Sequence, residues 1–117
     1  MNSTYNELNE IKKINGRGTN LVTLAIPKLQ FHMASTLLDN EAKNAACIKS
    51  ETLRDDVLNA IQSLQTCVKH MKPQDVFLFS GFDVSDKELK TFTVVPEKGI
   101  ISSILYVSDD MFHTDLM

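Results

Sequence analysis

Lys49 is the residue whose type and position most clearly offer chemistry. It stands directly before Ser50, a good helix N-cap residue, at the start of a long amphipathic segment. The backbone amides of a helix N-terminus attract phosphate oxygens, and a lysine beside them adds a mobile positive charge. The pattern indicates a phosphate-contacting tip, but an ordinary solvated lysine fits the same spacing.

Tyr106, Ser108 and Asp110 share one strand parity at the end of the last predicted strand, although the chain from Asp109 onward is expected to form a terminal loop or short turn. A tyrosine there can stack on a nucleobase, as aromatic side chains do in readers of single-stranded RNA. The alternative is a half-buried strand tyrosine.

Glu41 precedes a predicted turn. Its carboxylate can accept a hydrogen bond from the amino group of adenine or cytosine. The alternative is a solvated glutamate on the surface.

No arrangement of residues predicts a catalytic or metal site. His32, His70 and His113 lack the spacing of metal ligands, and the pair Asp109–Asp110 supplies too few oxygens for a cation. The stretch Gly16–Thr19 lacks the Gly-Lys-Ser/Thr ending of a P-loop and precedes a strand, so we interpret it as a helix stop and turn. We expect no enzyme activity, no cofactor and no metal.

The composition is that of one ordinary domain, with 117 residues of which 43% are hydrophobic and 23% charged. The formal net charge of −3 does not predict nucleic-acid binding, so RNA contacts would need a local patch. Cys47 and Cys67 form no disulfide framework. The N-terminus is polar, and the apolar runs fall short of the roughly 20 residues of a membrane span. We expect a cytoplasmic location, with no membrane or DNA partner.

Apolar periodicity predicts three helices. The first covers about Thr4–Lys13, the second about Leu29–Asn40 and the third about Ser50–Met71. A short linker, roughly Glu41–Cys47, would join the last two into an antiparallel hairpin. The Ile48–Lys49 tip of this hairpin should project away from the core.

Four segments are typical of strands. Leu21–Ile26 is apolar on both faces and ends at a proline, and Val76–Phe79 is a continuous apolar run turned at Gly81. Leu89–Val95 is rich in β-branched residues, and Ile100–Val107 is the last strand. Three strands in succession favour antiparallel pairing. The predicted fold class is α+β, a four-stranded mostly antiparallel sheet packed with helices, including a long helical hairpin.

Three motifs match one family in the same order. Gly18–Asn20 corresponds to the family's Gly-Thr-Ser, Asn44–Ser50 to its Thr-Ala-Ser-Asn-Ile-Lys-Ser, and Tyr106–Phe112 to its Tyr-x-Cys-x-x-x-Phe. Over roughly Ile11–Leu116, the chain resembles the N-terminal, stop-codon-reading domain of the class-1 peptide release factor of eukaryotes and archaea. The spacing of the motifs and the predicted elements around them agree with that resemblance.

The resemblance implies that the domain enters the ribosomal decoding site. The tip would contact the first base of a stop codon, and Glu41, Thr19, Tyr106 and Ser108 would surround the second and third bases. The implied partners are the mRNA stop codon, ribosomal RNA of the decoding site and, through other domains, a class-2 release factor GTPase. The implied mRNA- and rRNA-binding residues are Gly18, Thr19, Asn20, Glu41, Asn44, Ala45, Ala46, Cys47, Ile48, Lys49, Ser50, Arg54, Tyr106, Ser108, Asp110 and Phe112.

Several positions depart from the family pattern. Cys47 lacks the amide donor and acceptor of the family's asparagine. Ser108 replaces a cysteine, Asn20 replaces a serine, and Glu51 stands where a basic residue is usual. Arg54, in contrast, falls where the family has a helix arginine. These changes fit either an altered stop-codon preference or ordinary specificity in a diverged sequence.

The family's hydrolytic Gly-Gly-Gln belongs to a separate middle domain, and this tripeptide does not occur here. We expect residues 1–117 to form a single release-factor N-terminal domain, part of a longer factor, without the middle catalytic and C-terminal domains. A natural short protein is the alternative, because Met1 opens the chain. The alternative function is a stand-alone interaction or regulatory protein that has lost decoding. A small hydrolase is disfavoured by the missing catalytic arrangement.

Overall fold

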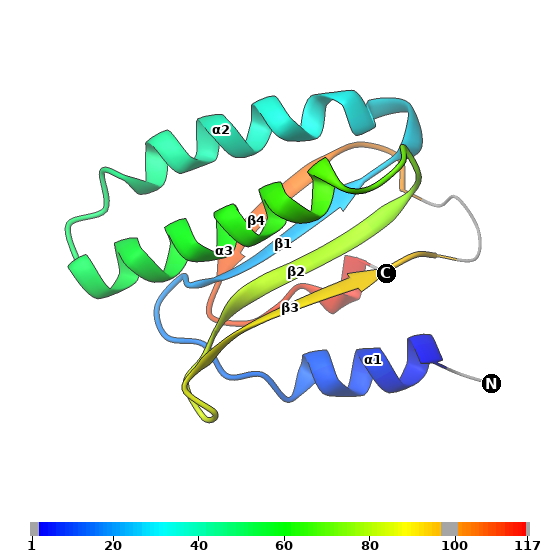
Figure 1. The fold of residues 1–117 in the computed structure, drawn as a ribbon. Helices are drawn as coiled ribbons and strands as arrows, with labels where there is room; N and C mark the ends of the chain where they lie inside the picture. The colour runs from blue at the N-terminus through cyan, green and yellow to red at the C-terminus, as the bar shows by residue number, and fades with distance from the viewer. Residues whose placement is uncertain (1–2, 97–100, 117) are drawn as a thin grey trace.

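A computed structural model describes residues 3–96 and 101–116 of the chain (Figure 1). Its regular elements alternate between helices and strands. In chain order they are α1 (Ser3–Lys12), β1 (Leu21–Ile26), the 3-10 helix η1 (Lys28–Met33), α2 (Ala34–Ala45), α3 (Glu51–Lys69), β2 (Val76–Asp83), β3 (Glu88–Val94), β4 (Leu105–Asp109) and the 3-10 helix η2 (Thr114–Leu116).

The strands form one sheet in the order β3-β2-β1-β4, with every neighbouring pair antiparallel. At the centre of the sheet, Leu24 of β1 lies opposite Leu78 of β2 on one side and Tyr106 of β4 on the other. The predicted α+β class with an antiparallel four-stranded sheet is therefore confirmed. The predicted strand Leu21–Ile26 has the same limits in the structure.

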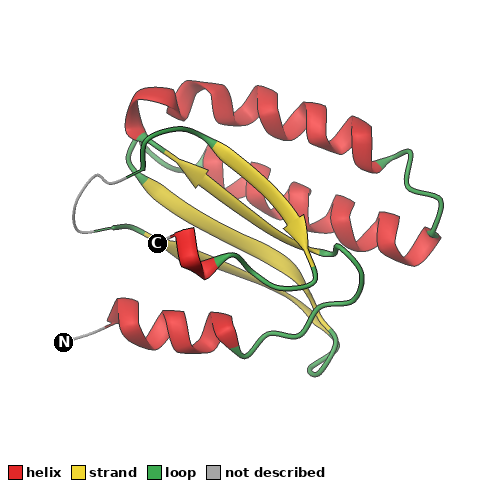
Figure 2. Cartoon of the chain, turned by 180° about the vertical axis from the view of Figure 1, so that it is seen from behind, coloured by secondary structure: helices red, strands yellow, loops and turns green. Residues whose placement is uncertain are grey.

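Helices cover both faces of the sheet. The α2–α3 hairpin lies on one face, and α1 and η2 lie on the other (Figures 1 and 2). Strand β1 is buried along its whole length, because its alternate side chains enter two separate cores. The hairpin-side core contains Val22, Leu24, Ile26, Phe31, Ala34, Leu38, Ala45, Val57, Ala60, Ile61, Leu64, Val76 and Leu78. The opposite core contains Ile11, Ile14, Leu21, Ala25, Phe77, Phe79, Val94 and Phe112.

The helical hairpin is confirmed, but two of its expected limits are wrong. Helix α2 continues to Ala45, so the expected linker over residues 41–47 is mostly helical. Alanine has the highest helix propensity, and Ala45 is buried in the hairpin-side core. Both effects stabilise the extension of α2 to Ala45. The start of the second helix is a 3-10 turn after Pro27. The expected N-cap of α3 is present, since the Ser50 hydroxyl accepts from the Leu53 amide.

Two expectations about the strands are corrected. Gly81 lies inside β2, which runs to Asp83, and not in a turn. The turn comes at residues 84–87, where Lys87 has a φ of 56°. The last strand begins at Leu105, while residues 97–100, including the expected strand start, lie outside the described residues. The Ile104 amide donates to the Gln30 side chain at 2.7 Å, so this residue joins η1 instead of the sheet ladder.

The close approach of β1 and β2 at Gly81 gives a stability prediction. A Cβ at this position would lie 2.8 Å from the Asn20 carbonyl oxygen and 2.9 Å from the Leu21 Cα. Backbone atoms cannot rotate aside, so we expect Gly81→Ala to lower the free energy of unfolding in urea by about 1–3 kcal/mol. The control Val84→Ala, at an exposed position, should change it by less than about 0.5 kcal/mol. Equal stability of Gly81→Ala and the wild type would contradict this packing.

Candidate nucleic-acid interface

The tip between α2 and α3 combines an exposed lysine with an ordered backbone. Lys49 is exposed and precedes the Ser50 cap of α3. Arg54 Nη1 donates to the Ile48 carbonyl at 3.3 Å, which ties the connection to the first turn of the helix. The Ile48 side chain packs against the hairpin-side core, so the expectation that it projects away is wrong. Lys49, with Ala46 and Cys47, remains available to a ligand.

The loop before β1 is held to α3 by the carboxylate of Asp56. Arg17 Nε and Nη2 donate to Asp56 at 2.9 and 3.3 Å, and the guanidinium lies 4.6 Å from the centre of the Phe82 ring. Asn20 Nδ2 donates to Asp56 at 3.3 Å and to the Phe82 carbonyl at 3.0 Å. The hydrogen bond to Asp56 raises the pKa of Arg17. We call Arg17, Asn20 and Asp56 the Asp56 network.

The loop also contacts the tip and the last strand. Gly18 has a φ of +63°, a conformation that glycine adopts without strain, and a Cβ there would meet Leu53 at 3.5 Å. A hollow of about 240 Å³ separates this loop from the start of α3. On the other side, the Ser108 hydroxyl of β4 donates to the Thr19 carbonyl. The loop therefore joins the first turn of α3 to β4.

A groove lies between the helical hairpin and β4. Tyr106 and Ser108 are opposite Leu24 and Val22 of β1, which places them on the hairpin side of the sheet. The groove has a volume of about 210 Å³. It is lined by Glu41, Asn44, Ala45, Ile48, Val57, Tyr106 and Ser108.

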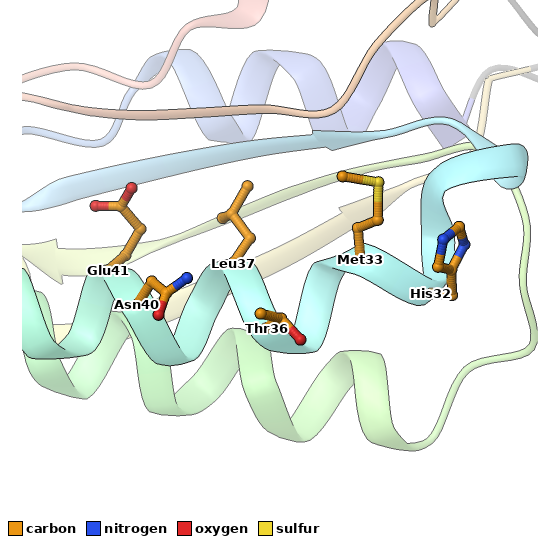
Figure 3. Close-up of a pocket in the computed structure, with 6 residues that line it drawn as sticks. All are labelled: His32, Met33, Thr36, Leu37, Asn40 and Glu41. Carbon is orange, nitrogen blue, oxygen red and sulfur yellow. The ribbon is translucent and has the colours of Figure 1, made fainter.

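A second groove continues along α2 from Glu41, which lines both. Its volume is about 420 Å³, and it is lined by His32, Met33, Thr36, Leu37, Asn40 and Glu41. Met33, Leu37 and Glu41 point to the same side of α2 (Figure 3). Met33 is 43% exposed although it is apolar. Glu41 therefore lies where the two grooves meet.

Tyr106 and Glu41 interact electrostatically. Burial raises the pKa of the Tyr106 phenol to about 12, and the negative charge of Glu41 adds to this rise. The phenol therefore keeps its proton at neutral pH and can donate a hydrogen bond into the groove. The partly buried ring of Tyr106 packs against the hairpin-side core. Tyr106 is therefore both the half-buried strand tyrosine and a groove-lining side chain, and the two alternatives do not exclude each other.

Three expected site residues lie elsewhere. Asn20 is fully buried and all its side-chain hydrogen bonds are internal, so it shapes the loop without being accessible. Phe112 is in the opposite core, with its ring centre 5.5 Å from that of Phe79. Asp110 lies beyond the end of β4, in the expected terminal loop, and does not continue the alternation of Tyr106 and Ser108.

The described residues contain no cluster of three or more histidine, cysteine, aspartate or glutamate side chains placed to bind a metal ion. Within the same part of the chain, no helix has the length and hydropathy needed to span a bilayer.

Asp109 and His113 form a pair with 2.9 Å between Oδ2 and Nε2, and the histidine lowers the pKa of the Asp109 carboxyl. This pair lies at the end of β4, whose last residue is Asp109, and is not part of the groove lining.

Comparison with known proteins decides the family. A family model described as eRF1 domain 1 matches residues 3–117. The chain belongs to the eRF1 domain 1 family. This confirms the resemblance suggested by the three motifs.

The relatives of this eRF1 domain 1 chain are longer proteins. It is 31% identical to peptide chain release factor subunit 1 of Thermoplasma acidophilum, over 94% of this chain and 28% of the relative. It is 35% identical to eukaryotic peptide chain release factor subunit 1 of Saccharomyces cerevisiae, over 92% of this chain and 26% of the relative.

Two solved structures have the same fold. One, described as an archaeal protein, matches with a TM-score of 0.87 at 28% identity. The other is a crystal structure of the archaeal translation termination factor aRF1, which matches with a TM-score of 0.79 at 27% identity. Each match covers 95% of this chain and 32% of the solved chain. The chain therefore spans about a third or less of these proteins.

Arg17, Asp56 and Val57 belong to the candidate interface but were not predicted from the sequence. A signal for Asp56 was present, because it lies three residues after Leu53 and four before Ala60, on the apolar face of α3. A carboxylate at a buried helix position needs a hydrogen-bonding or cationic partner. The periodicity alone does not identify Arg17 as that partner, since the two residues are far apart in sequence.

The pKa of Tyr106 gives a prediction that tests the groove directly. In a Tyr5→Phe background, which leaves Tyr106 as the only tyrosine, the folded protein should show phenol ionisation near pH 12 in an ultraviolet titration. Glu41→Gln should lower this pKa but leave it above the ordinary value of about 10, because burial is the larger cause.

The same shift affects stability at high pH. The pKa of Tyr106 is higher in the folded protein than in the unfolded chain, where it is about 10. This difference stabilises the folded protein below about pH 10, and the stabilisation is lost as the pH rises towards 12. The Tyr106→Phe variant should therefore lose less stability than the wild type between pH 10 and 12. Ionisation of Tyr106 near pH 10 in the folded protein would contradict its position in the groove.

Proposed function

We propose that this chain is the codon-reading domain of a translation termination factor. The observation that supports this most strongly is the groove, where Glu41, Tyr106 and Ser108 from distant parts of the sequence meet beside the Lys49 tip. These side chains offer hydrogen-bonding groups and an aromatic ring, which are the means by which proteins recognise unpaired RNA bases. The family membership and the names of the relatives support the same role.

In this proposal the parts of the interface have different tasks. Lys49, at the start of α3, contacts the RNA backbone near the first base of the stop codon. The groove receives the second and third bases, and the surrounding decoding-site ribosomal RNA contacts the exposed tip. Lys43, Lys49 and Arg54 supply local positive charge, because the net charge of −3 gives no general attraction to RNA.

We also propose that residues 1–117 act as one domain and depend on others for the remaining steps. The relatives are more than three times as long as the matched region. A middle domain would hydrolyse peptidyl-tRNA, and a class-2 release factor GTPase would act through the other domains. The domain itself then needs no catalytic residues, cofactor or metal.

The test is peptide release on a reconstituted ribosome. The full chain is joined to the remaining domains of the Saccharomyces cerevisiae relative and assayed on UAA, UAG, UGA and a sense codon. We expect release on at least one stop codon and none on the sense codon. Lys49→Ala should reduce the rate by about ten- to a hundredfold, since losing a charged hydrogen bond costs about 1.5–3 kcal/mol.

The matched control is Lys69→Ala. Lys69 is also exposed and lies at the opposite end of α3, so this variant has the same net charge as Lys49→Ala but leaves the tip intact. Its release rate should stay near that of the wild type. A folded fusion that binds ribosomes and releases on no stop codon would instead support an interaction or regulatory protein without decoding.

A further inference from the structure

The outer side of β4 is a sheet edge without a partner strand in the described residues. Strand β4 pairs with β1 on one side and is the last strand in the order β3-β2-β1-β4. Alternate backbone N–H and C=O groups of an edge strand point away from the sheet and can pair with another chain. Charged side chains protect such an edge, and β3 at the other edge has Glu88 and Lys90. Strand β4 has no charged residue before Asp109, its last residue, so its edge is the more open to pairing.

An apolar groove runs beside this edge. Met33 and Leu37 line the groove and point to the same side of α2 (Figure 3). At one end, the Ile104 amide donates to a side chain of η1, the element that contains Met33. At the other end, Glu41 lines a groove together with Ser108 of β4. Side chains of a strand added beside β4 would therefore point alternately into this groove and away from it.

The charges around the groove favour a basic residue at one end. Asp109 ends β4, and Asp110 follows it as an exposed residue. Asp109 is paired with His113 at 2.9 Å, and Glu41, which lines the groove beside the end of β4, adds a third carboxylate. At the opposite end, beside the start of β4, the lining has His32 instead of a carboxylate. A segment that lies along β4 is therefore matched by a cationic side chain at its Asp109 end.

We propose that the edge of β4 docks an extended peptide segment of a partner protein. The segment adds a strand antiparallel to β4, as in every neighbouring pair of this sheet. Backbone hydrogen bonds hold such a strand, and pockets for its alternate side chains select its sequence. The chemistry of the groove selects a basic residue that is followed by hydrophobic residues two and four positions later.

The antiparallel orientation fixes the register of this segment. Tyr106 and Ser108 face the hairpin side of the sheet, and peptide residues opposite them face the same side. The basic residue opposite Ser108 then lies near Glu41. The two hydrophobic residues lie opposite Tyr106 and Ile104, on the side of the apolar groove.

A second copy of the chain fits this edge less well. Antiparallel pairing of two β4 strands over their full length would place Leu105 of each copy opposite Asp109 of the other. Leu105 is 41% exposed, and a carboxylate opposite it offers neither an apolar contact nor an opposite charge. The charge pattern therefore favours a peptide of different sequence over self-pairing.

The direct test is binding of a probe peptide to the full chain, measured by fluorescence anisotropy. The probe is fluorescein-labelled Ser-Lys-Thr-Leu-Thr-Val-Thr-amide, which has the selected pattern and β-forming threonines between. We expect saturable binding that is about tenfold weaker when glutamate replaces the peptide's lysine. The absence of saturable binding would overturn the proposal.

A backbone substitution in the probe tests strand pairing itself. Successive amides of a strand point to opposite sides, so only one of two neighbouring amides can donate to β4. N-methylation of the leucine amide and of the following threonine amide is compared in two separate peptides. One of them should lose affinity by about tenfold and the other should stay within about twofold of the probe. Equal effects would contradict pairing with the edge.

Variants of the chain test the groove. Met33→Glu should weaken binding of the probe by about tenfold. Leu89→Glu is the matched control, because Leu89 is also 43% exposed but lies on β3 at the other edge; it should stay within about twofold of the wild type. Glu41→Lys should prefer the glutamate peptide over the lysine peptide, whereas Glu10→Lys, at an exposed position of α1, should keep the original preference. An unchanged preference in Glu41→Lys would overturn the assigned orientation.

The same site links docking to codon reading. Glu41 lines both this groove and the one that we propose for the codon bases. On the basis of the proposed function, a docked segment excludes the codon, so saturating probe should slow release by the fusion at least about tenfold. Probe binding without any effect on release would overturn this competition.

The outcomes separate the inference from the proposed function. Binding is measured on the chain alone, so the absence of release on every stop codon would contradict codon reading and leave the docking site intact. Release on stop codons by a chain that does not bind the probe would overturn docking and leave codon reading intact. Sedimentation that shows a dimer, abolished by Met33→Glu, would assign the edge to a second copy and overturn the proposal.

Discussion

Strand β1 is the element on which the rest of the structure depends. Its six residues are all buried, so the sheet must be covered on both faces, by the α2–α3 hairpin on one side and by α1 and η2 on the other. The pairing of β1 with β4 then determines that Tyr106 and Ser108 face the hairpin. The groove is a consequence of this pairing, because a shift of one residue would turn both side chains to the opposite face.

The second constraint is the charge of Asp56 on the buried side of α3. A carboxylate that is only 8% exposed needs partners, and the loop before β1 supplies them through Arg17 and Asn20. This interaction connects a loop, a helix and, through Thr19 and Ser108, the edge strand. The sequence differences at Asn20 and Ser108 thus belong to one connected set of contacts.

The sequence predicted the fold well where local patterns decide it. The limits of β1, the Ser50 cap and the apolar face of α3 follow from periodicity and capping, which act over a few residues. The prediction of a turn at Gly81 was wrong. A small residue is needed there because β1 approaches closely, and not because the chain turns. Phe112 belongs to a core that residues from α1, the sheet and the C-terminal segment build together. Such long-range contacts leave little signal in a single sequence.

In the proposed function, a stop codon lies between the tip and β4. The most direct measurement is photocrosslinking from a messenger that carries 4-thiouridine as the first base of the stop codon, with the fused chain bound to the ribosome. Mass spectrometry of the crosslinked peptides should place the base on residues 44–50, which form the end of α2 and the tip. Crosslinks to α1 or η2, on the opposite face of the sheet, would contradict the account.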